Sequence, residues 1–292
     1  MKKHKICKIL LVILAIFLCV AFYELLGICV AYKKQPEVSN TTKKETKNGS
    51  WNECSENTER AVIIEKNPEA LLQRVRLIKN AKKEIILSTF AFQSDESGKL
   101  ILGALHDAAD RGVHIRLLVD GMESWIDMEG NPYFYGLSSH ENVEIKLYNK
   151  ANPLKPWKIM GRMHDKYLIA DGKRYILGGR NTYNYFLGDF PGHKNYDRDV
   201  LVVCDEPEKE NSVNQLLEYF ETIWEQEDSG YFHDNKKLAN RKSVKNAVLE
   251  LQNGYQKYFE ENKERICDTD YTDETFETEK IALVSNPIHT GP

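Results

Sequence analysis

The longest apolar stretch of this chain lies at its N-terminus and limits what that segment can form. Ile9–Val30 holds 22 residues and is almost entirely apolar, with Tyr23 and Glu24 as the main exceptions. A helix of about 20 such residues spans the hydrocarbon layer of a membrane. A cleaved signal peptide is the competing interpretation, but its apolar region is usually only about 7–15 residues long. We therefore predict one N-terminal transmembrane helix, with Glu24 near an interface or a neighbouring helix.

The orientation of this helix follows less directly from the flanking charges. Four lysines precede the apolar run, and five more follow it by Lys47. Because both ends are basic, the positive-inside rule does not decide the orientation. A short basic tail before a first anchor usually stays inside, so we favour a single-pass anchor with an extracytoplasmic body.

The charge of the remaining chain limits its partners. Residues 1–34 carry six lysines and one glutamate, a net charge of +5. Because the formal charge of the whole chain is −4, the remaining residues carry a net charge of −9. Proteins dedicated to nucleic acids usually present a basic surface. Nucleic acid is therefore disfavoured as a partner. The six cysteines form no C-x-x-C pair, so neither a zinc site nor a disulfide framework is predicted.

Four segments can be distinguished by composition. Residues 1–34 are the basic tail and anchor, and 35–60 are a polar linker with few aliphatic residues. Residues 61–230 have the pattern of a catalytic lobe. Residues 231–292 are expected to form a helical extension and then the start of a second lobe, with a strand at Lys280–Ser285.

The lobe alternates strand and helix patterns. A buried strand at Glu84–Phe92 is followed by a helix at Asp95–Arg111 and a strand at Val113–Asp120, which ends in a turn at Asp120-Gly121. Two strands joined by a helix through short connections are typical of a parallel pair. Further strands are predicted at Val143–Tyr148 and Val200–Cys204. Helices are predicted from Asn67-Pro68, at Ser212–Glu225 and within Lys236–Glu264. The fold class is thus α/β, with a mixed sheet flanked by helices.

The residues with the clearest chemical meaning lie between Met163 and Asn181. His164 and Lys166 are two apart on a predicted strand, so their side chains project from the same face. Asp171-Gly172 is a tight-turn signal, and the strand returns as far as Gly178-Gly179. Asn181 follows, where a short helix at 182–186 is expected to begin. The hairpin would bring an imidazole, an ammonium, an amide and a glycine-lined backbone together, a set that suits a phosphate group.

This stretch resembles the phospholipase D superfamily. The motif of that family, H-x-K-x4-D-x6-G-(G/S)-x-N, is matched in full by His164, Lys166, Asp171, Gly178, Gly179 and Asn181. The upstream segments AKKEIILSTFAFQSDESGK and AADRGVHIRLLVDG are similar to the first lobe of bacterial cardiolipin synthase-like members. The resemblance covers roughly residues 65–224.

The resemblance implies a phosphohistidine mechanism without a metal or other cofactor. His164 would attack phosphorus, while Lys166 and Asn181, with the backbone of Gly178 and Gly179, would hold the phosphate oxygens. Asp171 belongs to the same catalytic motif, but its odd spacing from Lys166 points it to the opposite face, as a residue that supports the turn. Asp199 occupies the place where the family has an acid that orients the histidine, and Asp197 is the reserve candidate.

One feature departs from the family. Its sites need two such motifs, one histidine attacking and the other protonating the leaving oxygen, and this sequence contains one. The chain is therefore half of a two-lobed enzyme, one partner of a homodimer, or a truncated and inactive product. The leading function is phosphatidyl transfer or hydrolysis on anionic phospholipids at a membrane. The alternatives are a phosphodiesterase or nuclease of the same superfamily, and a non-catalytic half-domain.

Overall fold

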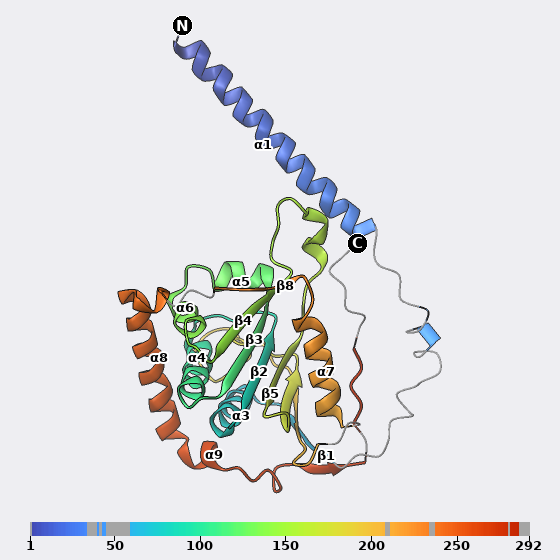
Figure 1. Cartoon of the computed structure of the whole chain (residues 1–292), viewed down its shortest axis with the longest axis vertical. Helices are drawn as coiled ribbons and strands as arrows, with labels where there is room; N and C mark the ends of the chain where they lie inside the picture. Colours follow the sequence, from blue (N-terminus) through green and yellow to red (C-terminus); the bar gives the residue numbers. More distant parts are fainter. Residues whose placement is uncertain are drawn as a thin grey trace.

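A computed structural model describes residues 2–33, 40, 43–44, 59–207, 211–233, 237–279 and 281–285 (Figure 1). Most of the predicted linker, 35–60, lies outside the described residues. The body begins at Glu59, close to the predicted boundary.

Within the described residues, nine strands form one sheet in the order β8-β4-β3-β2-β5-β6-β7-β1-β9. Strands β2, β3 and β4 run parallel, and all other neighbours pair antiparallel. The predicted mixed sheet is confirmed. The strands are β1 (Glu59–Ile64), β2 (Glu84–Thr89), β3 (His114–Asp120), β4 (Val143–Tyr148), β5 (Lys166–Ala170), β6 (Arg174–Gly178), β7 (Asp199–Val203), β8 (Ser229–Tyr231) and β9 (Phe276–Thr278).

Helices cover both faces of this sheet, as predicted. One face packs against α3 and α4, with α8 lying outside α4, and the other face packs against α7 (Figure 1). Two apolar cores result, because alternate residues of each buried strand point to opposite faces. The elements are α1 (Lys2–Lys33), α3 (Asn67–Asn80), α4 (Glu96–Asp110), α5 (Gly121–Asp127), α6 (Pro132–Ser138), η2 (Pro156–Met160), α7 (Ser212–Trp224), η3 (Leu238–Asn240), α8 (Lys242–Glu261) and α9 (Lys263–Cys267).

Two local predictions are corrected at turns. Asp120-Gly121 does not turn the chain; Asp120 caps α5, and its Oδ1 accepts hydrogen bonds from the backbone N–H groups of Met122 and Glu123. The short helix expected at 182–186 is absent, and the segment makes only a single turn. Asp95 Oδ2 accepts from the Asn184 backbone N–H at 2.7 Å, and Gly188, at φ 70°, turns the chain out of the helical path.

The C-terminal part of the chain agrees with expectation in its helix and differs in its strand. The long helix predicted within Lys236–Glu264 is confirmed as α8, which packs against α4 and α6, with η3 before it and α9 after it. Of the strand expected at Lys280–Ser285, residues 281–285 are described and are not a strand. Ile281 and Leu283 instead pack against the core beneath α7. The remainder of that prediction lies outside the described residues.

Helix α1 is long and apolar enough to cross a membrane, and it is the one such helix among the described residues. Most of its apolar side chains are exposed, in contrast to those of the body. Its C-terminal turns contact the η2 segment, and the rest of the helix extends away from the body (Figure 1).

Candidate active site

The pairing of β5 with β2 places the first two motif residues. In this antiparallel pair Lys166 lies opposite Thr89, the last residue of β2. His164 therefore lies beyond the end of β2, beside Phe90. The rings of His164 and Phe90 meet edge to face with centroids 4.7 Å apart, and Lys166 Nζ lies 5.3 Å from the Phe90 centroid. The predicted shared face of His164 and Lys166 thus converges on Phe90.

Asn181 also lies beside the segment that follows β2. The backbone N–H of Thr182 donates to the Ala91 carbonyl at 3.0 Å, which ties the segment after β6 to the segment after β2. Asn181 is buried, and its Oδ1 accepts from the Ala91 N–H at 3.3 Å. This contact fixes the amide so that Nδ2 is its donor side. The structure therefore brings His164, Lys166 and Asn181 together around Phe90 and Ala91.

Burial lowers the pKa values of the two basic groups of this cluster, Lys166 and His164. Lys166 is only 5% exposed, and this burial lowers the pKa of its ammonium to about 8. Its Nζ donates to the His164 carbonyl at 2.5 Å. Partial burial, reinforced by the positive charge of Lys166, lowers the pKa of the His164 imidazole. Near neutral pH the imidazole is therefore uncharged and nucleophilic, while the ammonium remains mostly protonated.

Asp171 lies at the opposite end of β5 from His164. It has a positive φ of 54° in the β5–β6 turn, and Gly172 beside it has φ 63°. Its carboxylate accepts backbone hydrogen bonds from Lys82 at 2.9 Å, Lys83 at 2.7 Å and Glu84 at 3.0 Å. Asp171 thus fastens the hairpin to the start of β2 and does not reach the His164 cluster.

Carboxylate side chains lie close to the backbone at the two glycines of the motif. A Cβ built on Gly178 would lie 2.1 Å from Asp199 Oδ1, and one on Gly179 would lie 2.0 Å from Asp197 Oδ2. Real Cβ atoms do not approach other atoms so closely. Glycine is therefore needed at both positions because Asp199 of β7 and Asp197 of the loop before it leave no room for a Cβ. A role for the N–H groups of the two glycines in phosphate binding stays a prediction.

Asp199 makes a different contact from the one expected. Its buried Oδ2 accepts from Arg74 Nη1 at 2.9 Å and from Arg180 Nη1 at 3.2 Å. Its Oδ1 has no hydrogen-bond partner among the described residues, so the expected hydrogen bond from His164 is not formed. The reserve candidate, Asp197, accepts from the Arg198 N–H at 2.7 Å and is one of the acids whose charge acts on Lys166.

Sequence reasoning missed the residues that hold the chain in front of His164. Asp120, at the end of β3, accepts from the Met163 N–H at 3.1 Å and from Arg162 Nη2 at 2.7 Å. The Arg162 guanidinium lies 5.1 Å from the Phe90 ring centroid. The available signal was the position of Asp120 at the carboxyl end of a parallel strand, where binding residues gather in open α/β sheets.

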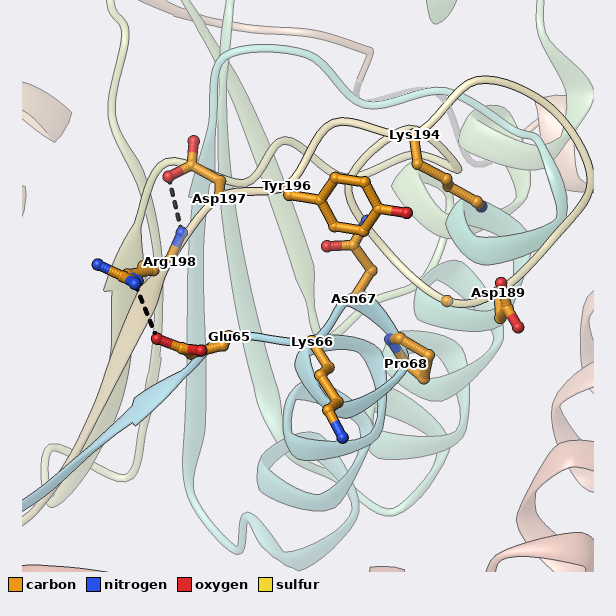
Figure 2. A pocket seen from close by; sticks show the side chains of 10 residues that line it. Glu65, Lys66, Asn67, Pro68, Asp189, Lys194, Tyr196, Asp197 and Arg198 are labelled. Atoms are coloured by element: carbon orange, nitrogen blue, oxygen red, sulfur yellow. Dashed lines mark hydrogen bonds and ion pairs between the residues drawn. The ribbon is translucent and has the colours of Figure 1, made fainter.

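A cavity of about 710 Å³ lies on the Gly179 side of this cluster. Asp197 lines it and also contacts the Gly179 backbone position, so the cavity and the motif share a wall. Figure 2 shows Asp197, Arg198 and Glu65 gathered at one end and Lys194 and Asp189 at the other. Arg198 pairs with Glu65 at 3.0 Å. The walls carry both charge signs, a lining suited to a polar group rather than to an acyl chain.

Comparison with known proteins identifies relatives of this chain. Residues 74–224, just over half of the chain, match a family model described as the PLD-like domain of cardiolipin synthase. Cardiolipin synthase C of Escherichia coli is 29% identical over 171 residues, which are 54% of this chain and 34% of the relative. An uncharacterized protein of Helicobacter pylori is 30% identical over 212 residues, 68% of this chain and 39% of the relative. The chain thus spans about two-fifths or less of these relatives.

The fold has a counterpart among solved structures. The phosphatidylserine synthase of Haemophilus influenzae superposes with a TM-score of 0.51 at 17% identity, covering 76% of this chain and 48% of that one. At this identity the likeness concerns the fold alone.

Replacing Asp171 with asparagine is expected to weaken the fold and spare the chemistry. The amide accepts the three backbone N–H groups less well than the carboxylate, so the free energy of unfolding should fall by about 1–2 kcal/mol. Denaturant unfolding measures this loss. Phosphodiesterase activity of the folded variant should stay within about tenfold of wild type, whereas Lys166→Ala should cost about 2.7–4 kcal/mol of barrier. A folded Asp171→Asn protein as inactive as Lys166→Ala would contradict this assignment.

The pKa values predict a bell-shaped pH profile for kcat/KM, which reports the free enzyme. Activity should fall as the pH rises through about 8, because Lys166 then loses its proton. It should fall again at acidic pH, below the usual histidine pKa, as His164 becomes protonated. Lys166→Arg should remove the alkaline limb, since a guanidinium keeps its charge. An alkaline limb unchanged in this variant would show that another group titrates there.

Proposed function

Because this chain belongs to the phospholipase D-like family of cardiolipin synthases, we propose that it is a membrane-anchored enzyme that acts on phospholipid phosphodiesters. The observation that supports this most directly is the convergence of His164, Lys166 and Asn181 on Phe90 and Ala91. Family membership supports phosphodiester-transfer chemistry in general. The lipid substrate and the anchor are the finer parts of the proposal.

The proposed reaction has two displacements at phosphorus. In the first, an imidazole nitrogen of His164 forms a bond to phosphorus, and the bond from phosphorus to the leaving alcohol oxygen breaks. That oxygen takes up a proton and departs. In the second, a hydroxyl of an acceptor alcohol or of water attacks phosphorus, loses its proton and releases His164. Lys166 and the Asn181 amide donate to the non-bridging oxygens and stabilise their charge in both transition states.

Two properties favour a phospholipid as the substrate. Helix α1 is suited to hold the body beside a bilayer. The body is acidic as a whole, but residues 146–180 carry nine basic residues and two acidic ones. Four of the nine pair with carboxylates of other segments, namely Lys158, Arg162, Arg174 and Arg180. The attraction for an anionic phosphodiester therefore rests on the others, among them Lys155 and Lys166.

The leaving oxygen needs an acid, and we propose that a second lobe supplies it. Within the described residues, one H-x-K motif with its following aspartate, glycine pair and asparagine is present. A second copy of this chain, or a second lobe, would bring a second histidine to the opposite side of the phosphate.

His164→Ala is expected to abolish both turnover and the covalent intermediate. Wild-type protein mixed with a phospholipid carrying a radioactive phosphate should retain label after denaturation at alkaline pH, and the label should be lost on treatment with acid, as expected of a histidine phosphoramidate. The matched control is His193→Ala, since His193 lies outside the cluster on an exposed loop. EDTA should leave activity unchanged, and loss of activity with the chelator would overturn the metal-free mechanism.

The assembly proposal predicts that the active species is larger than one chain. The full-length protein in detergent should show activity only in fractions whose protein mass, separated from detergent by light scattering with refractive index, is at least twice 33.8 kDa. Activity in a monomer fraction would defeat pairing between copies.

A further inference from the structure

The loop between β4 and β5, Asn149–Arg162, is the part of the body that contacts α1. Tyr23 of α1 donates its hydroxyl to the Leu154 carbonyl at 2.8 Å. Gly27 is buried there, and a Cβ on it would lie 2.3 Å from Pro156 Cγ. Ala31, one turn further on, is 1% exposed. The small residues of one α1 face thus allow the helix to lie directly against this loop, which we term the η2 loop.

This contact fixes how deep the η2 loop lies relative to the apolar run. Tyr23 precedes Val30, the end of that run, by seven residues, which is about 10 Å along a helix. Leu154 lies beside Tyr23 and not beside the polar end of α1. If Ile9–Val30 spans the hydrocarbon layer, the tip of the η2 loop lies at or below the headgroups.

The loop is built to hold this position. Asn149 Nδ2 donates to the carbonyls of Lys158 at 2.7 Å and Gly161 at 2.6 Å, which closes the base of the loop. Lys158 Nζ also pairs with Asp228 at 2.8 Å. These bonds tie the loop to the body, so its depth in the membrane sets the depth of the body.

The exposed side chains of this region are those of an interfacial surface. Leu154 is 78% exposed and Met160 51%, while Trp125 and Ile126 of α5 are each 66% exposed. The loop and α5 lie at the end of the body from which α1 departs (Figure 1). Exposed tryptophan is typical of the membrane interface.

A cavity of about 560 Å³ joins α5 to the loop and leads towards the site. Trp125 and Lys155 line it, as does Glu24 of α1. Arg162 also lines it, and its guanidinium lies over the ring of Phe90, which contacts His164.

We propose that the η2 loop, together with Trp125 and Ile126, is a membrane-docking surface that inserts into the interface of an anionic phospholipid bilayer. Its apolar side chains enter the acyl boundary, while Lys150 and Lys155 contact the headgroups. The surface holds the His164 cluster at headgroup level. The inference rests on the anchor of the proposed function and is independent of its chemistry.

Fluorescence quenching by brominated lipids tests the surface in the full-length chain. Leu154→Trp and Ile63→Trp, each made in a Trp125→Phe background, add one tryptophan at an exposed apolar position. Ile63 is 61% exposed on β1, which lies near the opposite edge of the sheet from β4, the strand that leads into the η2 loop. The proteins are reconstituted into vesicles of phosphatidylglycerol and phosphatidylcholine, with or without bromine on the acyl chains.

The bromolipid should reduce the added emission of Leu154→Trp about twofold or more, since interfacial side chains lie within several ångströms of the acyl boundary. The emission added by Ile63→Trp should not change. Lys155→Glu in the Leu154→Trp protein should lessen quenching on phosphatidylglycerol vesicles more than on pure phosphatidylcholine; an equal effect on both would remove the anionic headgroup from the proposal.

The outcomes separate the docking surface from the proposed function. A protein that floats with the vesicles while Leu154→Trp stays unquenched would overturn the docking surface and leave the anchor intact. A protein that fails to float would contradict the anchor and the docking surface together. Neither result depends on turnover, which the His164→Ala comparison measures separately.

Discussion

The antiparallel register between β2 and β5 determines where the chemistry can occur. It sets Lys166 opposite the last residue of β2, so the chain leaving β2 passes between the His164–Lys166 pair and Asn181. Leu168 belongs to the core on the α3 and α4 face and Tyr167 to the core beneath α7. A slip of one residue would exchange these faces and carry Lys166 away from His164's neighbour Phe90. The apolar pattern of β5 therefore protects the geometry of the site.

Burial removes water from the Lys166 ammonium, and a negatively charged substrate can supply the interaction that is lost. The ammonium has lost most of its water, and the bond to the His164 carbonyl is its short-range compensation. An anionic phosphodiester would supply the missing opposite charge in a site where water screens little, so its binding should raise the pKa of Lys166. Binding of the phosphate therefore offsets the free-energy cost of burying Lys166 in the empty site. The offset is greatest when negative charge develops in the transition state.

The sequence was sufficient for the central strands and for the motif, and insufficient for strands β1, β8 and β9 and for the contacts between distant segments. The strand predicted at Val143–Tyr148 coincides with β4, and the odd spacing of Asp171 from Lys166 agrees with its position away from Lys166. Asp199 could not be placed in this way, because its partner Arg74 is 125 positions earlier in the chain. The glycine pair likewise makes room for carboxylates that only the fold brings near. The sequence predicts Asp120 as a turn residue, because its bond to Met163, 43 positions later, exists only in the fold.

The connection from β4 to β5 links the candidate site to α1. Its middle contacts α1 through Leu154 and Pro156, and its end is clamped to β3 by the Arg162–Asp120 pair. His164 follows two residues after that clamp. Because Asn149 closes the loop at its base, α1 cannot shift relative to the body without straining the segment that presents His164. Under the proposed function, this stretch would set both the height of the body above the bilayer and the position of His164, so that a phosphodiester at a fixed depth in the membrane would meet the imidazole at a fixed place.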